Sequence, residues 1–365
     1  MNAILKSQPA PIRYQAGAHI ADIEQRLGLS QVIKLASNEN PLGPSPLALA
    51  ALHSLSNLHR YPDDKNVGLK QIIAQRLQLE SARLLISNGT THLIDTIVQS
   101  LCAPDDEILL FEKTFIYYRI SAQNHHINYE EVSRGPGFAY DADKLISKIS
   151  QRTRLVFIAA PDNPTGVYLK KAELEKILAA LPERAILIFD EAYREYVPAE
   201  LYFDPTLLHD PRLLILRTFS KIYGLAGFRC GYAIGDPALI EALSQIQAPF
   251  SVSAVAQAVA SAALLDEAHL ERARQLNQTE RERLTQALSQ NEILYIKGYG
   301  NFITINTFPL TGEVIYEKLL SKGVIIRPLD MYGLDYFIRV TIGLPEENQC
   351  FLQQLLSMYQ YIATI

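Results

Sequence analysis

Short, solid runs of apolar residues alternate along this chain with longer stretches of helix-like, amphipathic spacing. Strict two-residue alternation of apolar and polar positions is rare. The clearest strand-like runs cover residues 108–111, 155–160, 186–189 and 213–217. Solidly apolar strands are typical of a sheet that is buried on both faces. The pattern therefore predicts an α/β fold in which a mostly parallel sheet is flanked by helices.

Helical spacing covers residues 68–79, 170–183 and 263–290, and the second of these segments is expected to end near Pro182. The third is long and rich in polar residues, so we interpret it as the connector to a smaller α+β domain. That domain is expected to contain strands at 302–305 and 337–342, with a helix at 313–322 between them. The predicted division is an N-terminal arm that packs on the small domain, a large domain and a small C-terminal domain, at residues 1–35, 36–260 and 261–365.

Composition narrows the class of protein. A chain of 365 residues, of which 48% are hydrophobic, is long enough to form more than one core. A net charge of −5 and the lack of any basic run argue against nucleic acid as a partner. No apolar stretch is long enough for a membrane span, and the N-terminus has no apolar signal core. The three cysteines, Cys102, Cys230 and Cys350, are scattered without metal-ligand or disulfide spacing, so we expect no metal and a cytoplasmic location.

Polar side chains with distinct chemistry follow three of the predicted strands. Asp190 follows the run 186–189, Asn163 follows the strand LVFIAA, and Ser220 and Lys221 follow LLILR. Ligands of open α/β sheets bind outside the carboxyl ends of the strands, so these groups are expected to meet in one crevice. A lysine, a carboxylate and an amide together match the needs of pyridoxal phosphate, which requires an amine for a Schiff base, an acid at its ring nitrogen and donors for its phenolate oxygen.

Two further segments could bind the phosphate of such a cofactor. Gly89, Thr90 and Thr91 directly precede an amphipathic helix, and amides at a helix start bind anions. Arg229 lies eight residues after Lys221, and its guanidinium suits phosphate.

Each residue also has an ordinary structural interpretation. Lys221 could be a solvated surface charge, Asp190 or a threonine could be a helix N-cap, and Arg229 could form a structural ion pair. The tetrapeptide NPTG at 163–166 could be an ordinary turn. No single motif is decisive.

Taken together, the motifs resemble those of fold-type I pyridoxal-phosphate-dependent aminotransferases over nearly the whole chain. NPTG, DEAY at 190–193, and Ser-Lys with an arginine eight residues later stand in the order and spacing of that group. Within it, the chain is most similar to the histidinol-phosphate aminotransferase family. The segments that carry this resemblance are KLASNENPLGPSP, RYPD, LRTFSKIYGLAGFRCGYAIG, GVIIRPL and FIRVTIG.

The resemblance implies a large domain with a sheet of the seven-stranded type and a specific role for each matching residue. Lys221 would form the Schiff base and move the proton, and Asp190 would keep the ring nitrogen protonated. Tyr193 and Asn163 would contact the phenolate oxygen, and Tyr118 would stack on the ring. The residues implied to contact the cofactor are Gly89, Thr90, Thr91, Tyr118, Asn163, Asp190, Tyr193, Thr218, Ser220, Lys221 and Arg229, with Tyr61 contributed across a homodimer interface.

The resemblance also implies a substrate site and a reaction. Arg339 would bind the anionic end of the substrate, with Tyr14, Asn163 and Arg327 beside it. The implied reaction converts L-histidinol phosphate and 2-oxoglutarate to imidazole acetol phosphate and L-glutamate, a step of histidine biosynthesis. The implied partners are these small molecules and a second copy of the chain, with active sites shared between the subunits.

The chain departs from the usual family pattern at three places. Thr90, Thr91 and His92 follow Gly89 where a small residue, an acid or amide and a glutamate are usual, Lys113 and Thr114 precede the aromatic segment, and Asp162 replaces an asparagine. These changes leave phosphate donors in place but bear on the substrate.

Three alternatives stay open at this point. They are an aminotransferase for aromatic or other pathway-specific amino acids, a pyridoxal-phosphate-dependent decarboxylase of a phosphorylated amino acid, and a non-catalytic binding module. The intact Lys221, Asp190, Asn163 and Arg229 argue against the binding module. No G-x-G-x-x-G motif follows a strand, which argues against a nicotinamide-dependent dehydrogenase.

Overall fold

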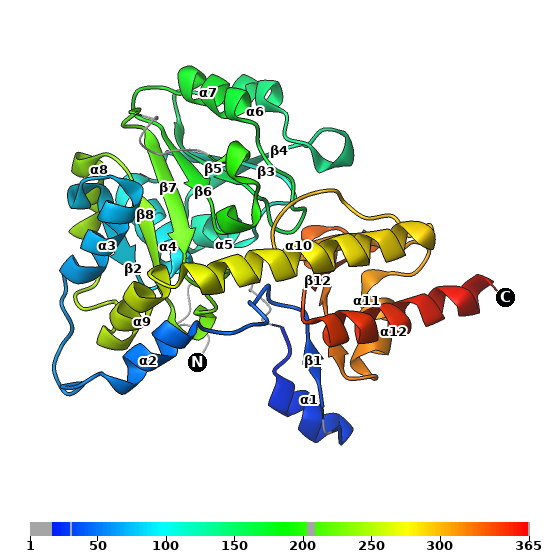
Figure 1. Cartoon of the computed structure of the whole chain (residues 1–365). Coiled ribbons are helices and arrows are strands. Elements are labelled where there is room, and N and C mark those ends of the chain that lie inside the picture. The colour runs from blue at the N-terminus through cyan, green and yellow to red at the C-terminus, as the bar shows by residue number, and fades with distance from the viewer. Residues whose placement is uncertain (1–16, 30, 203–208, 364–365) are drawn as a thin grey trace, which may run out of the picture.

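A seven-stranded sheet forms the centre of the larger of two lobes in a computed structural model that describes residues 17–29, 31–202 and 209–363 (Figure 1). In spatial order its strands are β2 (Leu84–Ser87), β8 (Gly231–Ile234), β7 (Leu213–Thr218), β6 (Ile186–Asp190), β5 (Thr153–Ala159), β3 (Glu107–Phe111) and β4 (Asn128–Val132). All neighbours pair in parallel except at β8, which is antiparallel to both β2 and β7. The predicted mostly parallel sheet is confirmed.

Helices cover both faces of this sheet. One face is covered by α4 (Thr90–Leu101), α5 (Tyr117–Asn124) and α8 (Pro237–Ser244). On the other face lie α2 (Pro46–His53), α3 (Val67–Leu77), α6 (Ala142–Lys148), α7 (Lys171–Ala180) and α9 (Ala254–Leu264).

The two-sided cover explains why the strands are solidly apolar. In β6, Ile186 and Ile188 belong to the core under α4, whereas Leu187 and Phe189 belong to the core under α7. Successive side chains of a strand point to opposite faces, so a strand between two helical layers needs apolar residues at every position.

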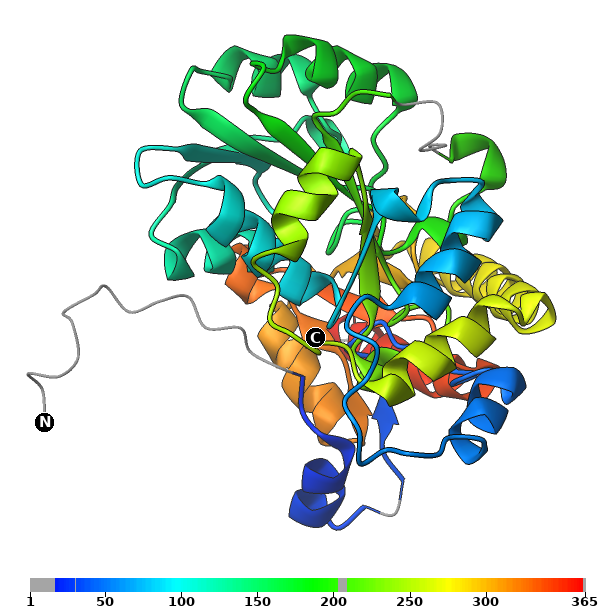
Figure 2. The same cartoon turned by 90° about the vertical axis from the view of Figure 1, so that its left-hand side faces the viewer.

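The smaller lobe is built on an antiparallel sheet of β11 (Arg327–Pro328), β12 (Phe337–Thr341) and β9 (Phe302–Asn306). Helices α11 (Gly312–Leu320) and α12 (Pro345–Ala363) pack against it. A separate short pair joins β1 (Ile33–Lys34) to β10 (Val324–Ile325) in parallel. Helix α1 (Ile20–Leu27) lies beside this lobe in both views (Figures 1 and 2).

One long helix, α10 (Glu267–Gln290), belongs to both lobes. Leu270 and Ala273 near its start lie in the core of the larger lobe, and Leu284 and Leu288 near its end lie in the core of the smaller one. The sequence pattern predicted a single helix over 263–290, and that prediction is wrong at its start. The structure has α9 end at Leu264, and α10 starts after Asp266, whose carboxylate accepts a hydrogen bond from the His269 amide at 3.1 Å.

The predicted N-terminal arm, residues 1–35, is described from residue 17, apart from residue 30. Ile23 and Val32 pack with Ile325 of the smaller lobe.

The predicted domain boundaries stay a prediction. Because α10 lies in both cores, we propose that the transition between domains falls within this helix rather than at residues 260 and 261. No helix in the described part of the chain is long and apolar enough to cross a membrane.

A tight crossing of two backbone segments lies next to the strand ends. The segment around Gly43 passes over the loop that follows β7, and a Cβ atom at Gly224 would lie 2.1 Å from the Gly43 carbonyl oxygen. Gly224 also has a φ of +69°, in the region that favours glycine. The Asn40 side-chain amide donates to the Ile222 carbonyl at 2.6 Å and holds the same crossing together.

We expect Gly224→Ala to lower the free energy of unfolding by at least ~2 kcal/mol, because the methyl group clashes with backbone and the residue keeps a strained φ. Gly227→Ala, three residues later, is the matched control, since no atom of the described residues beyond its chain neighbours lies within 4 Å of its Cβ position. It should change stability by less than about 0.5 kcal/mol. Urea unfolding of both variants measures the difference, and equal stabilities would contradict this account of the crossing.

Candidate active site

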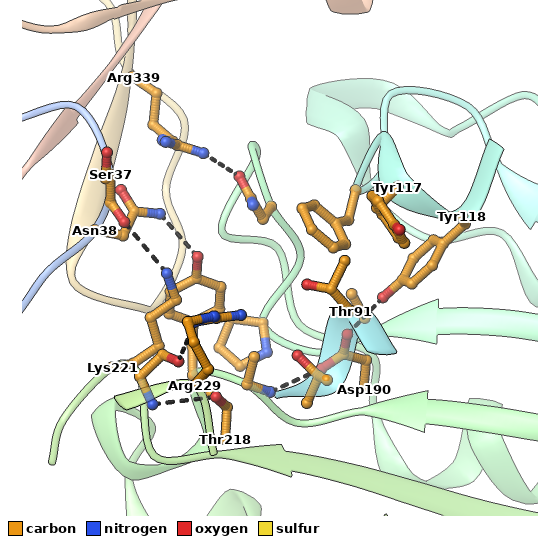
Figure 3. Close-up of a pocket in the computed structure, with 18 residues that line it drawn as sticks. Ser37, Asn38, Thr91, Tyr117, Tyr118, Asp190, Thr218, Lys221, Arg229 and Arg339 are labelled. Carbon is orange, nitrogen blue, oxygen red and sulfur yellow. Dashed lines mark hydrogen bonds between the residues drawn. The ribbon is translucent and has the colours of Figure 1, made fainter. Parts of the chain in front are cut away.

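The polar residues that follow the central strands meet in one cavity of about 310 Å³ (Figure 3). Asp190 is the last residue of β6 and Thr218 the last of β7, and Lys221 follows three residues later. Because β5, β6 and β7 are adjacent and parallel, their carboxyl ends open at the same edge of the sheet. The predicted site residues that line the cavity are Thr90, Thr91, Tyr118, Asn163, Asp190, Tyr193, Thr218, Ser220, Lys221, Arg229 and Arg339.

Asp190 is a buried carboxylate whose two oxygens are both hydrogen-bonded. Its Oδ2 accepts from the Tyr118 hydroxyl at 2.9 Å, and its Oδ1 accepts from the Ala192 amide at 3.0 Å. Burial raises the pKa of Asp190 to about 6, although the hydrogen bonds from Tyr118 and Ala192 act in the opposite direction. A carboxylate in this state is suited to bind a protonated, positively charged group from the cavity.

Lys221 and Tyr193 lie close together in the cavity. The Lys221 Nζ donates to the Ser37 carbonyl at 3.2 Å and lies 5.4 Å from the centre of the Tyr193 ring. Burial raises the pKa of Tyr193, with Arg339 and the Asn38 hydrogen bond opposing, so its phenol stays protonated at neutral pH.

One end of the cavity presents donors suited to a phosphate. Helix α4 starts at Thr90, its N-cap is Gly89 with φ +82°, and no side chain caps its first turn. The structural interpretation of a threonine N-cap is therefore wrong, and no side chain of the described residues caps the first amides of α4. Arg229 donates from Nη1 to the Ser220 hydroxyl at 3.2 Å. Together these groups form an anion site of backbone amides, hydroxyls and one guanidinium.

Gly89 does not line the cavity, but it is required for this arrangement. A Cβ atom at residue 89 would lie 2.7 Å from the Arg229 Nη2 atom. Its lack of a side chain lets the guanidinium approach the start of α4.

Arg339 enters the cavity from β12 of the smaller lobe. It is 6% exposed, and its Nη2 donates to the Ala36 carbonyl at 2.7 Å. Its Nη1 donates to the Asn163 side-chain oxygen, which leaves the Asn163 Nδ2 as a donor. The Arg339 Nε has no hydrogen-bond partner among the described residues. A buried guanidinium with an unused donor is suited to an anionic ligand.

Arg327 does not line the cavity, but its backbone pairs with that of Arg339. The two residues are opposite each other in the β11–β12 ladder. Side chains that are directly opposite in an antiparallel pair share one face, so the two guanidinium groups lie on the same side of this sheet. Arg327 is buried and donates to the Met331 sulfur at 3.6 Å.

Tyr118 has a different environment from the one expected. Its side chain is fully buried, its ring stacks on Phe157 with centroids 4.6 Å apart, and the Phe115 ring makes a T-shaped contact with it at 5.5 Å. Because its ring stacks on Phe157 and its hydroxyl donates to Asp190, we propose contact to Asp190 as its role in place of the expected stacking. Phe115 also lines the cavity, and we propose it as the ring that packs on a bound planar group.

Tyr61, another predicted residue, lies apart from the cavity. Tyr61 is 82% exposed and stacks on Phe250 at 4.6 Å. Tyr14 lies outside the described residues.

Sequence reasoning also missed cavity residues. Ser37 and Asn38 line the cavity and belong to the run SNEN, which carries part of the family resemblance but received no role from it. Four consecutive polar residues directly after the apolar Leu35 and Ala36 were the available signal.

The buried Asp190 carboxylate generates a prediction about pH and stability. A carboxyl group whose pKa is higher in the folded than in the unfolded protein weakens stability as pH rises from its unfolded value of 3.8 through about 6. We expect the cofactor-free Asp190→Asn variant to be more stable than the wild type at pH 8, by up to ~3 kcal/mol.

This advantage should shrink as the pH falls below about 6, because the wild-type carboxyl then becomes neutral. Urea unfolding between pH 5 and 8 measures it. Asp143→Asn is the control, because Asp143 is an exposed residue on α6. Parallel pH curves for wild type and Asp190→Asn would contradict the prediction.

Comparison with known proteins agrees with this geometry. Residues 30–355 match the family model described as aminotransferase class I and II. The chain is 40% identical over 347 residues to histidinol-phosphate aminotransferase 1 of Nitrosococcus oceani, covering 94% of this chain and 93% of the relative. It is also 40% identical to the histidinol-phosphate aminotransferase of an Anaeromyxobacter species, covering 92% and 93%.

Solved structures show the same fold. The histidinol-phosphate aminotransferase of Sinorhizobium meliloti, solved in complex with pyridoxal-5'-phosphate, matches with a TM-score of 0.87 at 25% identity, covering 97% of this chain and 99% of that one. A double mutant of Thermus thermophilus aspartate aminotransferase matches with a TM-score of 0.83 at 20% identity, covering 94% and 96%, and supports the fold alone. The chain therefore belongs to the class I and II aminotransferases and, within them, to the histidinol-phosphate aminotransferase family.

Proposed function

We propose that this protein uses pyridoxal phosphate to transfer the amino group of L-histidinol phosphate to 2-oxoglutarate, which yields imidazole acetol phosphate and L-glutamate. The observation that carries the proposal is the convergence of Lys221, Asp190, a phosphate-suited end and Arg339 on one cavity. The relatives named above at 40% identity support the choice of substrate.

The residues present fit the cofactor. The start of α4, Ser220 and Arg229 would hold its phosphate, and Lys221 would bind its aldehyde group. Asp190 would hold a proton at the ring nitrogen, because its buried carboxylate gains most from a cationic partner. Bound pyridoxal phosphate supplies a conjugated ring that accepts the electrons released when the Cα–H bond of the amino donor breaks.

The remaining polar groups bind, orient and move protons. Tyr193 and the Asn163 amide would donate to the phenolate oxygen of the cofactor. Lys221 would take the proton from the Cα atom of the amino donor and return it at the C4′ position of the cofactor, since its flexible stem reaches both positions.

A phosphate ester fits the substrate end better than a carboxylate alone. Such an ester carries up to two negative charges and three acceptor oxygens, whereas one bidentate arginine saturates a carboxylate. Arg339 lines the cavity, and Arg327, on the same face of the β11–β12 sheet, would supply a second guanidinium group. We retain Tyr14 as a proposed hydroxyl donor to the same phosphate.

We also propose that the protein is a homodimer in which Tyr61 reaches the cofactor phosphate of the partner subunit. Tyr61 and Phe250 form a stacked aromatic pair, and both are exposed in the isolated chain. The Asp64 carboxylate accepts from the Phe250 amide at 2.5 Å and fixes this pair on the surface. An exposed, ordered aromatic pair is suited to a protein interface.

A cytoplasmic location is part of the proposal. Cys102, Cys230 and Cys350 are free thiols in the structure, and free thiols are typical of a reducing compartment.

Substrate choice is tested by substitution of the paired arginines. Arg339→Ala should lower kcat/KM for histidinol phosphate by roughly 30- to 150-fold, because one charged hydrogen-bond partner contributes ~2–3 kcal/mol. Arg327→Ala should also lower it, whereas the surface variant Arg272→Ala should not. The assay follows glutamate formed from 2-oxoglutarate, with Lys221→Ala as the inactive control.

Three results would contradict the substrate assignment. They are a preference of the wild type for phenylalanine over histidinol phosphate, an unchanged constant in Arg327→Ala, and release of CO₂ from a phosphorylated amino acid in place of amino transfer.

Subunit mixing tests the shared site. Tyr61→Phe should weaken retention of pyridoxal phosphate, because it removes a donor to the cofactor phosphate. Mixed dimers of Tyr61→Phe and Lys221→Ala subunits should regain one complete site and hence part of the cofactor binding. Tyr336→Phe is the matched control, since Tyr336 is also exposed and packs on a phenylalanine. A fully active monomer, or no recovery in the mixture, would contradict the shared site.

A further inference from the structure

Asn38 is a buried cavity residue whose side chain contacts Tyr193. It is 1% exposed and has a φ of +55°. Its Nδ2 lies 2.8 Å from the Tyr193 hydroxyl oxygen (Figure 3). An amide nitrogen only donates, so in this arrangement the Tyr193 oxygen accepts and its own proton must point elsewhere.

Thr341, at the end of β12, contacts Asn38 twice. The Asn38 backbone N–H donates to the Thr341 Oγ1 at 2.9 Å. The same Oγ1 lies 3.1 Å from the Asn38 side-chain Oδ1 and donates its proton there. Thr341 is 3% exposed, so water does not supply alternative partners freely.

These contacts favour one direction for the protons in this chain of hydrogen bonds. The backbone N–H can only donate, so the Thr341 oxygen accepts from it and is left to donate to Oδ1. That donation places the Asn38 carbonyl toward Thr341 and its NH₂ group toward Tyr193. Tyr193 then has a proton to donate into the cavity.

The flipped amide is the competing arrangement. With Oδ1 toward Tyr193, the tyrosine would donate to Asn38 and would present a lone pair to the cavity. The Thr341 oxygen would then accept from two N–H groups, and its proton would have no acceptor among the described residues. A buried hydroxyl proton without a partner is costly, so the first arrangement is favoured.

We propose that Thr341 and Asn38 are positioning residues that turn the Tyr193 hydroxyl proton into the cavity, toward the phenolate oxygen of bound pyridoxal phosphate. The inference rests on the proposed function only in that the cofactor lies against Tyr193. Thr341 of the smaller lobe would thereby influence the pH at which bound pyridoxal phosphate titrates. This role is separate from substrate binding by Arg339.

The charged groups around Tyr193 do not account for this effect of Thr341 on the cofactor titration. Arg339, Asp190 and Asp162 influence the pKa of Tyr193, and the Lys221 Nζ lies over its ring. None of these charges changes when Thr341 is replaced by an uncharged residue, so a Thr341 variant tests the hydrogen-bond direction.

The test is a pH titration of the visible absorbance of bound pyridoxal phosphate in Thr341→Val. Valine keeps the shape and removes the hydroxyl, which frees the Asn38 amide to flip. Loss of a hydrogen-bond donor to the anionic phenolate oxygen favours the protonated form of the bound cofactor. The midpoint pH of the titration should therefore rise by roughly 0.5–1 unit. Thr341→Ser keeps the hydroxyl and should titrate like the wild type.

A double-mutant comparison shows whether the effect passes through Tyr193. In a Tyr193→Phe background, Thr341→Val should cause no further shift, because the proton whose direction matters is gone. If Thr341→Val fails to fold, as judged by circular dichroism, Thr341→Ala provides a second variant without the hydroxyl.

Two outcomes would overturn the inference. One is an unchanged midpoint in a folded variant that lacks the hydroxyl, and the other is an equal shift with and without the Tyr193 hydroxyl. The titration needs bound cofactor but no amino donor. A normal titration with no turnover of histidinol phosphate would therefore contradict the proposed substrate and leave this inference standing.

Discussion

Parallel pairing of β6 with β5 on one side and β7 on the other places Asp190 beside Ala159 and Leu216. The carboxyl ends of these strands are fixed further by a buried ion pair, in which the Arg217 Nε donates to the Glu191 Oε2 at 2.8 Å. Glu191 directly follows Asp190, and Arg217 lies four residues before Lys221. Removal of one partner from such a pair typically costs ~3–5 kcal/mol, because the other charge is left buried. The acid and the amine of the site therefore depend on this one alignment.

The second constraint is contact between the lobes. The core of the larger lobe holds the acid, the amine and the phosphate-suited end, whereas the smaller lobe contributes Arg339 and Thr341. Hydrogen bonds join the two lobes, including one from Arg339 to Asn163 at the cavity and one from the Tyr299 amide to the Gly166 carbonyl at 2.7 Å. Because α10 lies in both cores, the lobes are also connected by a continuous helix.

Buried charge is concentrated next to the cavity, at a cost in stability. Asp162, where the family usually has asparagine, is fully buried, and it forms an ion pair with Arg134 at 2.8 Å. It also accepts from Thr114 at 2.5 Å and from Thr165 at 2.8 Å. A departure from the family pattern is thus compensated within this chain, since Asp162 has a cation and two hydroxyls as partners. These contacts tie the loop that carries Asn163 to the ends of β3 and β4.

The sequence alone determined the four adjacent parallel strands β3, β5, β6 and β7, part of their helical cover and most of the cavity, because each depends on local pattern. Apolar strands must be buried on both faces, and polar residues directly after parallel strands must meet at one edge. The positions of Asp190, Asn163 and Lys221 after their strands were therefore enough to place them together. Strands β2, β4 and β8 were missed, and the edge strand β4, with the sequence NYEEV, carries no such pattern. The break between α9 and α10 was missed as well, since apolar spacing continues across it.

Tertiary structure alone decided which neighbour each side chain contacts. Tyr118 and Phe115 are three residues apart and both line the cavity, and only the folded chain shows that Tyr118 stacks on Phe157 and donates to Asp190. The partnership of Asn38 with Thr341 joins residues 303 positions apart, so no local pattern could indicate it. The direction of the Tyr193 proton depends on that contact, because a hydrogen bond has a direction only once both partners are in place.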